Sequence, residues 1–523
     1  MNTDLDIPQN IISDVMSHHA LHSPMKTALV VGNRRISWGE MNSGINRVAN
    51  RLLADGIEKG DRICFVMATS VEYFYLMFGA MKAGAMAVPL SAMLSSDQLA
   101  GLIDDAGAKL LFTDEVCRPL LTSVESRLAT VRVEGFFSTV ENGHWRSIED
   151  WLAGASEKEP PLRLMMDDDA TISYSSGTTG LPKGIVYSHR ARLHLGIDYA
   201  VHMHIDSGST CVATTPLYSN GTSIMMFPAL FSGGTLVLME SFDTRAFLEV
   251  VDREKATHTM MVPTQFIKLL AEPAFDDYDI SSMRVFCTCG SPMRRDLKRI
   301  VLERLGPRLS ELYGLSEGGV TMIRPDEMAT RLDSVGTPLP GFELRVLDME
   351  GNELPRGQIG ELAFYGGWAM RRYHNQPERT AETIWRDARG RSFIRTGDIG
   401  RMDDDGYVYV VDRKKDMIIS GGFNVFPADI EAVVGEHPAV EDVAVVGIGH
   451  PLWGESPVAA VRLRPHASAQ PEEIRAWCNA RLAKSQRLAK VILRMEFPRN
   501  ALGKVLKPAL RDEYRDLLTP PSF

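Results

Sequence analysis

Residues 174–184 read YSSGTTGLPKG and follow a short β-prone run at 170–173. Glycine allows positive φ and close approach of the backbone to an anion, hydroxyl groups donate hydrogen bonds, and lysine adds a positive charge. A loop of this composition can hold the phosphates of a nucleotide. Its candidate contacts are Ser175, Ser176, Gly177, Thr178, Thr179, Gly180 and Lys183.

The loop differs from the P-loop pattern GxxxxGK[ST], in which a Ser or Thr after the lysine binds the metal. Here Gly184 follows Lys183 and Pro182 precedes it. A metal ion at this loop therefore needs a ligand from elsewhere in the chain. A Gly/Ser/Thr-rich stretch on its own is as often a surface turn or linker, so the remaining motifs decide the interpretation.

Four further motifs follow in order: ELYGLSE at 311–317, RTGD at 395–398, DRKKD at 412–416 and PRNALGK at 498–504. With the loop at 174–184 and an opening segment between 36 and 90, they resemble the core motifs of the adenylate-forming superfamily, and most closely its acid:CoA ligase branch. The resemblance covers nearly the whole chain. It implies that an organic acid reacts with ATP to give acyl-AMP and pyrophosphate, and that CoA then takes the acyl group and releases AMP. ATP, Mg²⁺ and CoA are the implied cofactors.

Residue roles follow from the same resemblance. Glu317 matches the carboxylate that binds Mg²⁺, which favours hard oxygen ligands. Lys504 matches the lysine that stabilises the adenylation transition state; a protonated ammonium acts there through its charge and not as a base. Tyr313 and Gly314 match the adenine contacts, and Ser316 stands where Thr is more frequent.

Further nucleotide and CoA contacts are also implied. Asp398 and Arg413 would bind the ribose hydroxyls, and the segment Gly290, Ser291 and Pro292 would run along the adenine. Gly421 and Gly422 would let the pantetheine arm of CoA pass close to the backbone. Lys415 matches the hinge about which a C-terminal domain rotates to deliver Lys504, although one more exposed lysine is an equally good interpretation.

The segment PLYSNG at 216–221 lacks the histidine that many relatives carry after Pro-Leu and an aromatic residue. No Asp stands there to hold a substrate ammonium, which favours a plain organic acid. Medium- or long-chain fatty acids and aromatic acids both stay open. The predicted wall of the acid pocket consists of Tyr218, Ser219, Asn220, Ser223, Met226, Thr288 and Gly318.

Composition restricts the class of protein. A chain of 523 residues exceeds what one hydrophobic core usually serves, so at least two domains are expected: 1–413 with the ATP and acid sites, and 414–523 with the catalytic lysine. The net charge of −10 does not predict nucleic-acid binding. An acidic N-terminus and the absence of a long apolar run predict no export signal or membrane span, which makes the cytoplasm the default.

Six scattered cysteines fit a reducing compartment better than a disulfide framework. Cys287 and Cys289 could suggest a metal site, but no second cysteine pair or nearby histidine completes a zinc set, so they are interpreted as a buried wall.

Hydrophobic periodicity predicts a helix over 40–55 and strands near 62–67, 109–113, 211–215, 235–239 and 283–288. Alternating strands and helices indicate layered α/β subdomains. The region 334–367 predicts a β-rich subdomain, and the chain after residue 413 predicts a small α+β domain with helices opening at Pro427 and Pro471.

Two alternatives to free CoA ligation stay open. The enzyme could load the phosphopantetheine of a separate carrier protein, or the chain could be a nucleotide-binding protein that has lost catalysis. Retention of Glu317, Asp398 and Lys504 argues against the second.

Overall fold

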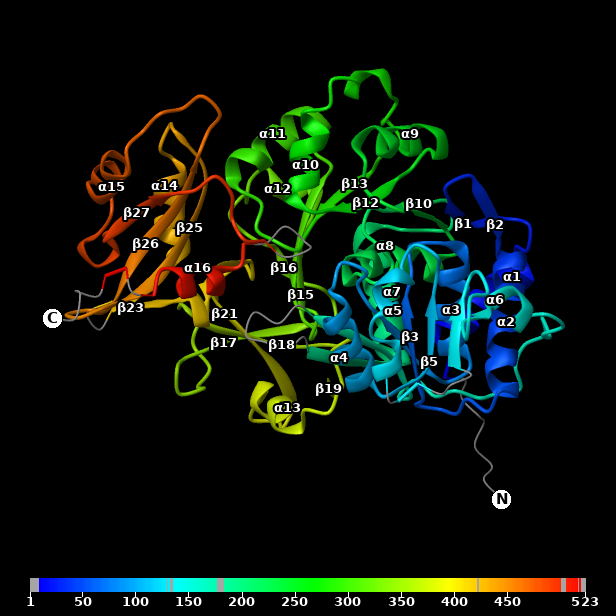
Figure 1. The fold of residues 1–523 in the computed structure, drawn as a ribbon. Helices are drawn as coiled ribbons and strands as arrows, with labels where there is room; N and C mark the ends of the chain where they lie inside the picture. Colours follow the sequence, from blue (N-terminus) through cyan, green and yellow to red (C-terminus); the bar gives the residue numbers. More distant parts are fainter. Residues whose placement is uncertain are drawn as a thin grey trace. The chain divides into compact units, whose positions relative to one another are not determined.

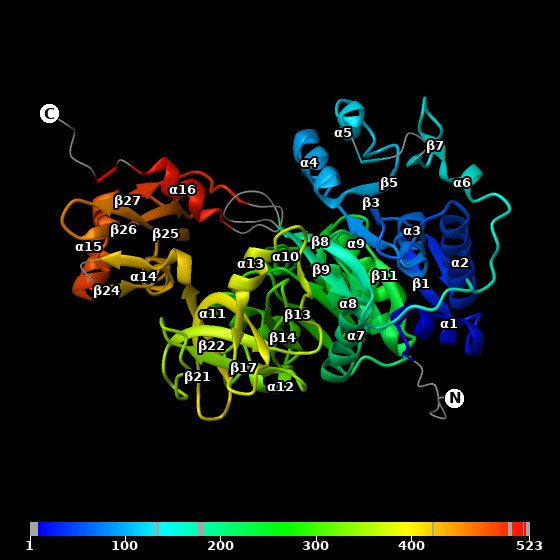
Figure 2. The ribbon, with the colours of Figure 1, turned by 90° about the horizontal axis from the view of Figure 1, so that it is seen from below.

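The structure is a computed structural model that describes residues 9–128, 130–131, 135–175, 183–420, 423–499, 505–515 and 517–518 (Figures 1 and 2). The described residues form two compact units. The first contains the chain up to residue 175 together with 183–343 and 365–394, and the second contains 344–364 and the chain from residue 395. The predicted domain boundary at residue 413 stays a prediction.

A nine-stranded sheet lies in the first unit, in the order β16-β15-β14-β13-β12-β10-β11-β1-β2. Its core from β1 to β14 is parallel. Such sheets are covered on both faces and have nearly continuous apolar strands. The bounds are β1 Thr27–Val31, β2 Arg34–Ser37, β10 Thr210–Ala213, β11 Thr235–Leu238, β12 His258–Met261, β13 Val285–Thr288, β14 Leu309–Gly314, β15 Val320–Ile323 and β16 Thr337–Pro338.

Helices cover both faces of this sheet (Figure 1). Alternate strand residues enter two cores, one with α9, α10 and α11 and the other with α7 and α8. The bounds are α7 His189–Met203, α8 Asn220–Ser232, α9 Thr244–Glu254, α10 Pro263–Leu270, α11 Arg295–Leu305 and α12 Pro325–Met328.

The second sheet of this unit has eight strands in the order β19-β9-β8-β4-β3-β5-β6-β7. Its strands are β3 Arg62–Val66, β4 Met86–Pro89, β5 Ala108–Thr113, β6 Phe136–Ser138, β7 Arg146–Ser147, β8 Asp169–Ser175, β9 Lys183–Ser188 and β19 Arg372–Tyr373. Among the described residues, six α-helices come before β8 in the chain: α1 Ile12–His22, α2 Trp38–Ala54, α3 Val71–Lys82, α4 Ser96–Ala106, α5 Pro119–Thr122 and α6 Ile148–Trp151.

Helix α2 confirms the predicted periodic segment. Ser37 and Glu40 form a reciprocal capping box at its start, which satisfies two backbone N–H groups. The predicted apolar face is buried along its whole length, and its members are Met41, Ile45, Val48, Ala49 and Leu52. The helical period of the apolar residues was therefore sufficient to locate this element.

The remaining sheets match the predicted β-rich region and the small C-terminal α+β layer. One contains β17 Glu343–Leu347, β18 Gly360–Tyr365, β20 Ile384–Arg386, β21 Ser392–Met402 and β22 Val408–Arg413, with α13 Pro377–Thr383 before β20. The other contains β23 Ile418–Ser420, β24 Phe423–Val425, β25 Val440–His450, β26 Gly454–Leu463 and β27 Lys490–Leu493, with α14 Pro427–Gly435, α15 Pro471–Asn479 and α16 Lys507–Glu513. The mixed α/β fold class is confirmed. Among the described residues, no helix has the length and apolar character needed to cross a bilayer.

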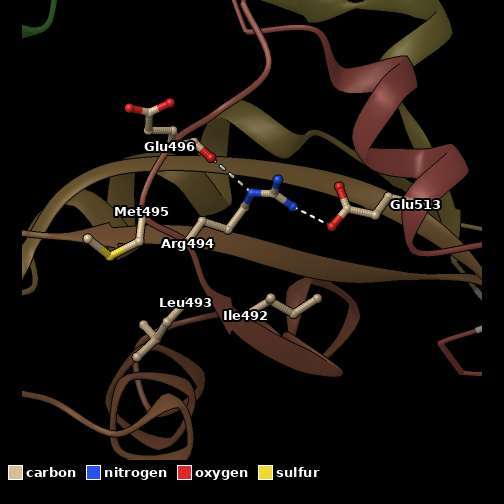
Figure 3. A pocket seen from close by; sticks show the side chains of 6 residues that line it. All are labelled: Ile492, Leu493, Arg494, Met495, Glu496 and Glu513. Atoms are coloured by element: carbon tan, nitrogen blue, oxygen red, sulfur yellow. Dashed lines mark hydrogen bonds and ion pairs between the residues drawn. The ribbon is translucent and has the colours of Figure 1, made fainter.

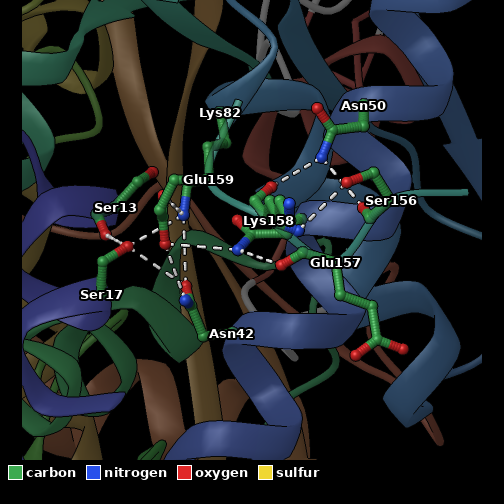
Figure 4. A network of polar contacts seen from close by, with 10 residues as sticks. Ser13, Ser17, Asn42, Asn50, Lys82, Ser156, Glu157, Lys158 and Glu159 are labelled. Carbon is green, nitrogen blue, oxygen red and sulfur yellow. Dashed lines mark hydrogen bonds and ion pairs between the residues drawn. The ribbon is translucent and has the colours of Figure 1, made fainter. Parts of the chain in front are cut away.

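A buried lysine links α1, α2 and α3 to the connection that follows α6 (Figure 4). Lys82 is 6% exposed and its Nζ lies 2.6 Å from Glu159 Oε2. It also donates to Ser17 Oγ at 2.9 Å and to Asn42 Oδ1 at 3.2 Å. These partners compensate the charge that burial removes from water.

The same contacts change the acidity of Glu159. Burial would raise its pKa, but hydrogen bonds from Asn42 and Lys82 outweigh that effect and lower the pKa to about 2. An unfolded glutamate titrates near 4.5. The ionised carboxylate therefore stabilises the fold above pH 4.5, and this contribution is lost as the pH falls towards 2.

We expect Glu159→Gln to destabilise the protein by about 1 kcal/mol or less at pH 7, because half of the side chain is exposed and water screens the pair. The melting temperature of the variant should lie below that of the wild type at pH 7, and the gap should shrink between pH 4.5 and pH 3. The matched control is Glu157→Gln, since the exposed Glu157 side chain points away from the network (Figure 4). A gap that is independent of pH would contradict this role.

Candidate active site

The carboxyl ends of β10, β12, β13 and β14 lie at one edge of the nine-stranded sheet, because these neighbouring strands are parallel. Ligands of parallel α/β sheets bind at this edge. The chain leaves β10 into the segment 214–219, leaves β13 into 289–292, and leaves β14 into 315–319. The fold thus gathers three of the predicted motifs that are far apart in sequence.

Glu317 lies in the short connection between β14 and β15. Its backbone carbonyl accepts a hydrogen bond from Met370 N at 2.8 Å, and its Oε1 accepts one from Tyr373 Oη at 2.7 Å. The Nζ of Lys183 lies 5.0 Å from the centre of the Tyr373 ring. Lys183 and Glu317, predicted to work on the same nucleotide, therefore meet at one tyrosine.

Tyr373 was missed by the sequence analysis. It lies 56 residues after Glu317 and reaches the site because β19 pairs with β9 directly beside the phosphate loop, with Tyr373 opposite Ile185. Burial and the charge of Glu317 raise the pKa of its hydroxyl, which therefore stays a hydrogen-bond donor at neutral pH. Neither its spacing nor its neighbours in the sequence distinguished it from other tyrosines.

We expect Tyr373→Phe to lower acid-dependent ATP–pyrophosphate exchange by about tenfold, since one hydrogen bond to a charged group is worth about 1.5–3 kcal/mol and part of it is recovered by water. The Mg²⁺ concentration for half-maximal exchange should rise, because the carboxylate is no longer oriented. An unchanged Mg²⁺ requirement would show that the hydroxyl does not position Glu317.

The donor set around Glu317 fits a magnesium ion. Among the described residues, its Oε2 makes no hydrogen bond or ion pair, so one hard oxygen remains available beside the phosphate loop. Mg²⁺ is typically held by one or two carboxylates together with substrate phosphates and water. One carboxylate oxygen from the protein is therefore enough to bind Mg²⁺ if the phosphates of ATP and water supply the remaining oxygen ligands.

The phosphate loop itself is described only at its two ends. Ser175 is paired with Lys183 across the antiparallel β8–β9 hairpin, which places both at the base of the loop. Ser176, Gly177, Thr178, Thr179 and Gly180 lie outside the described residues. Their contacts with phosphate stay predictions.

The predicted adenine segments lie at the same sheet edge. Gly290 has φ of +88° two residues after the end of β13, and Ser291 and Pro292 follow it. Tyr313 is half-buried at the end of β14, and a Cβ at Gly314 would stand 2.8 Å from Gly319 O. A larger residue at position 314 would therefore push the two strands apart at the turn that carries Ser316 and Glu317.

A cavity of about 20 Å³ lies between the two sheets of the first unit. Its wall includes Met77 and Met81 of α3, Thr171 and Ser173 of β8, and Arg192 of α7. The predicted pocket residues that line it are Tyr218, Ser219, Asn220, Ser223 and Met226. The fold thus brings together five of the seven residues that were predicted for the acid pocket.

Thr288 and Gly318 do not line this cavity. Thr288 is fully buried at the end of β13, and its hydroxyl has no hydrogen-bond partner among the described residues. Gly318 has φ of +119°, and a Cβ there would stand 2.7 Å from Ala369 Cα. Its role in the structure is close backbone packing beside Glu317.

Hydrogen bonds connect the cavity to the Glu317 loop. Asn220 Oδ1 accepts from Ser173 Oγ at 3.2 Å, and Asn220 Nδ2 donates to Tyr187 Oη at 3.3 Å. Tyr187 Oη in turn donates to Ser316 O. The amide of Asn220 thus connects the cavity wall to the loop that carries Ser316.

In the second unit, β21 and β22 pair Asp398 with Arg413. The side chains form an ion pair at 2.7 Å between Asp398 Oδ1 and Arg413 Nε, and Asp398 is 2% exposed. Lys415 lies in a 3₁₀ turn at Lys414–Asp416. Gly421, Gly422 and Lys504 lie outside the described residues, so their roles stay predictions.

A recess of about 480 Å³ opens elsewhere in the second unit, beside β27 and α16 (Figure 3). Arg494 in its wall is already paired with Glu513 at 2.6 Å, and the neighbouring Met495 is 89% exposed. No predicted site residue lines it. The smaller cavity beside Asn220 is the better candidate for the acid because polar groups converge on it.

Residues 16–374 match the family model of AMP-binding enzymes. The chain belongs to this family. Residues 429–504 match the model of the AMP-binding enzyme C-terminal domain. This AMP-binding enzyme is thus a member of the adenylate-forming superfamily, in the acid:CoA ligase branch.

Two curated relatives illustrate the range of the family. The enzyme is 31% identical to the long-chain-fatty-acid–CoA ligase FadD13 of Mycobacterium tuberculosis over 92% of this chain and 93% of the relative. It is also 31% identical to a feruloyl-CoA synthase of an Amycolatopsis species, over 94% and 96% of the two chains. The crystal structure of ATP-bound MatB from Rhodopseudomonas palustris has a TM-score of 0.88 and 30% identity, and covers 97% of this chain and 100% of that chain.

Proposed function

We propose that this enzyme activates an organic carboxylic acid with ATP and transfers the acyl group to CoA, releasing AMP and pyrophosphate. The observation that carries the proposal is the hydrogen-bonded connection from the Asn220 cavity through Tyr187 to Ser316, next to the site where Lys183 and Glu317 meet at Tyr373. An acid in the cavity would have its carboxylate directed to the phosphate loop.

The chemistry follows from the leaving group. A free carboxylate cannot lose oxide to a thiol, so its oxygen attacks the α-phosphorus of ATP, the bond to pyrophosphate breaks, and AMP becomes the leaving group for the second step. Lys183 supplies positive charge beside the phosphates, and Glu317 is the carboxylate that would hold Mg²⁺. When bound, Mg²⁺ would neutralise the charge that develops on the phosphate oxygens.

The second unit supplies three sets of residues in this proposal. Lys504 approaches the α-phosphate during adenylation, and rotation at Lys415 then brings Gly421 and Gly422 into place for the pantetheine arm. Asp398 and Arg413 bind the ribose hydroxyls, the carboxylate as acceptor and the guanidinium as donor.

Both acid classes left open by the sequence have a relative: FadD13 is named for long-chain fatty acids and the Amycolatopsis enzyme for feruloyl-CoA. A panel of fatty and aromatic acids tested for acid-dependent ATP–pyrophosphate exchange and for CoA-dependent AMP release examines the proposal. Absence of exchange with every acid would favour a nucleotide-binding protein without catalysis. Exchange without AMP release on CoA, but with release on a phosphopantetheinylated carrier protein, would favour the carrier-loading alternative.

A further inference from the structure

Arg192 is a buried cation in the wall of the cavity. It is 4% exposed and lies in the first turn of α7. Its Nη2 donates to Thr171 Oγ1 at 2.6 Å and to Ser173 Oγ at 3.3 Å, and its Nε donates to Thr171 Oγ1 at 3.0 Å. Its guanidinium carbon lies 3.9 Å from the centre of the Tyr187 ring. All of these neighbours are neutral.

The other buried cations of the described chain have acidic partners. Only Lys82, Arg192 and Lys298 among the described lysines and arginines are buried. Lys82 pairs with Glu159 and Lys298 pairs with Glu311. Arg192 pairs with no carboxylate among the described residues, and its Nη1 donates to none of them.

This placement is costly for the free protein. Burial lowers the pKa of Arg192 to about 10, although Tyr187 partly opposes the effect. An unpaired buried charge is unfavourable, and the helix dipole disfavours a cation in the first turn. An apolar side chain of the same length would fill the site at lower cost, so the positive charge calls for an anionic ligand.

We propose that Arg192 binds a second carboxylate of the acid substrate, and that the preferred substrates are therefore dicarboxylic acids, aliphatic or aromatic. The inference rests on the proposed function and specifies its substrate class. The Tyr187 ring contacts the guanidinium, and its hydroxyl donates to Ser316 O beside Glu317, so Arg192 is linked to the predicted adenylation site through one side chain.

Binding of such an acid would require side chains of the cavity wall to move. Its volume of about 20 Å³ is enough for one water molecule. Met77, Met81 and Met226 are unbranched and adapt readily to an incoming ligand. Asn220 and the hydroxyls of Ser219 and Ser223 supply further polar contacts along the wall.

Matched acids test the proposal in the full-length enzyme: glutarate against pentanoate, and isophthalate against 3-methylbenzoate, where a methyl group replaces the second carboxylate. We expect kcat/KM for exchange to favour the better diacid over its monoacid by about ten- to a hundredfold, the range of charge-assisted hydrogen bonds. Arg192→Met should lose this factor, so that the ratio of kcat/KM for the diacid to kcat/KM for the monoacid falls to within about threefold of one. Arg192→Lys should fall between the two, because it keeps the charge without the planar fork.

A thermal measurement separates ligand recognition from a structural role. The diacid should raise the melting temperature of the wild type but not of Arg192→Met, and the free variant should melt no lower than the free wild type. Equal losses for diacid and monoacid, or a wild-type preference for both monoacids, would overturn the inference while the proposed function stands. Absence of exchange with every acid would overturn both.

Discussion

Lys504→Ala should abolish acid-dependent ATP–pyrophosphate exchange while synthetic acyl-AMP still reacts with CoA. The ammonium is proposed to neutralise charge that develops between the attacking carboxylate and the α-phosphate, and this charge is absent from thioester formation. Removal of one preorganised electrostatic group lowers the rate by about a hundred- to a thousandfold. Exchange of labelled pyrophosphate and AMP release from acyl-AMP measure the two half-reactions separately.

The matched control for this prediction is Lys490→Ala, which removes an exposed lysine at the start of β27 in the second unit. It should leave both half-reactions unchanged. If Lys504→Ala slowed both half-reactions equally, Lys504 would act in both steps. That outcome would contradict the proposed rotation at Lys415.

Glu317→Gln should lower exchange by about a hundred- to a thousandfold, because the neutral amide keeps the shape of the side chain but loses the charge that holds Mg²⁺. The hydrogen bond from Tyr373 Oη can still be accepted by the amide oxygen, so the loop should keep its conformation. Titration of exchange with Mg²⁺ should show a markedly higher half-maximal concentration. The melting temperature should change little.

Glu303→Gln provides the control for a change of charge on the same unit, since Glu303 is an exposed residue of α11. It should leave the Mg²⁺ titration unaltered. A Glu317→Gln variant with normal Mg²⁺ dependence and a normal rate would remove Glu317 from the metal site and require another ligand.

Local patterns were sufficient for much of the fold. The capping residues and apolar period of α2, the proline-led starts of α14 and α15, and the apolar strands of the parallel sheet were all readable, because these features act over a few residues. The phosphate loop and the motif around Glu317 were predicted for the same reason, because the chemistry expected of them is concentrated in short segments.

The residues that complete the site could not be found this way. Tyr373 reaches Glu317 only because a two-residue strand, β19, joins the sheet beside β9. In the sequence, Arg192 is a charged residue near the start of a helix and has no distinguishing neighbour. The packing of α7 against β8 and α8 buries it, and no carboxylate of the described residues lies beside it. The short sequence motifs were enough to predict which side chains act on ATP, the acid and CoA. Contacts between distant segments set their surroundings, because burial and charge compensation depend on which elements pack together.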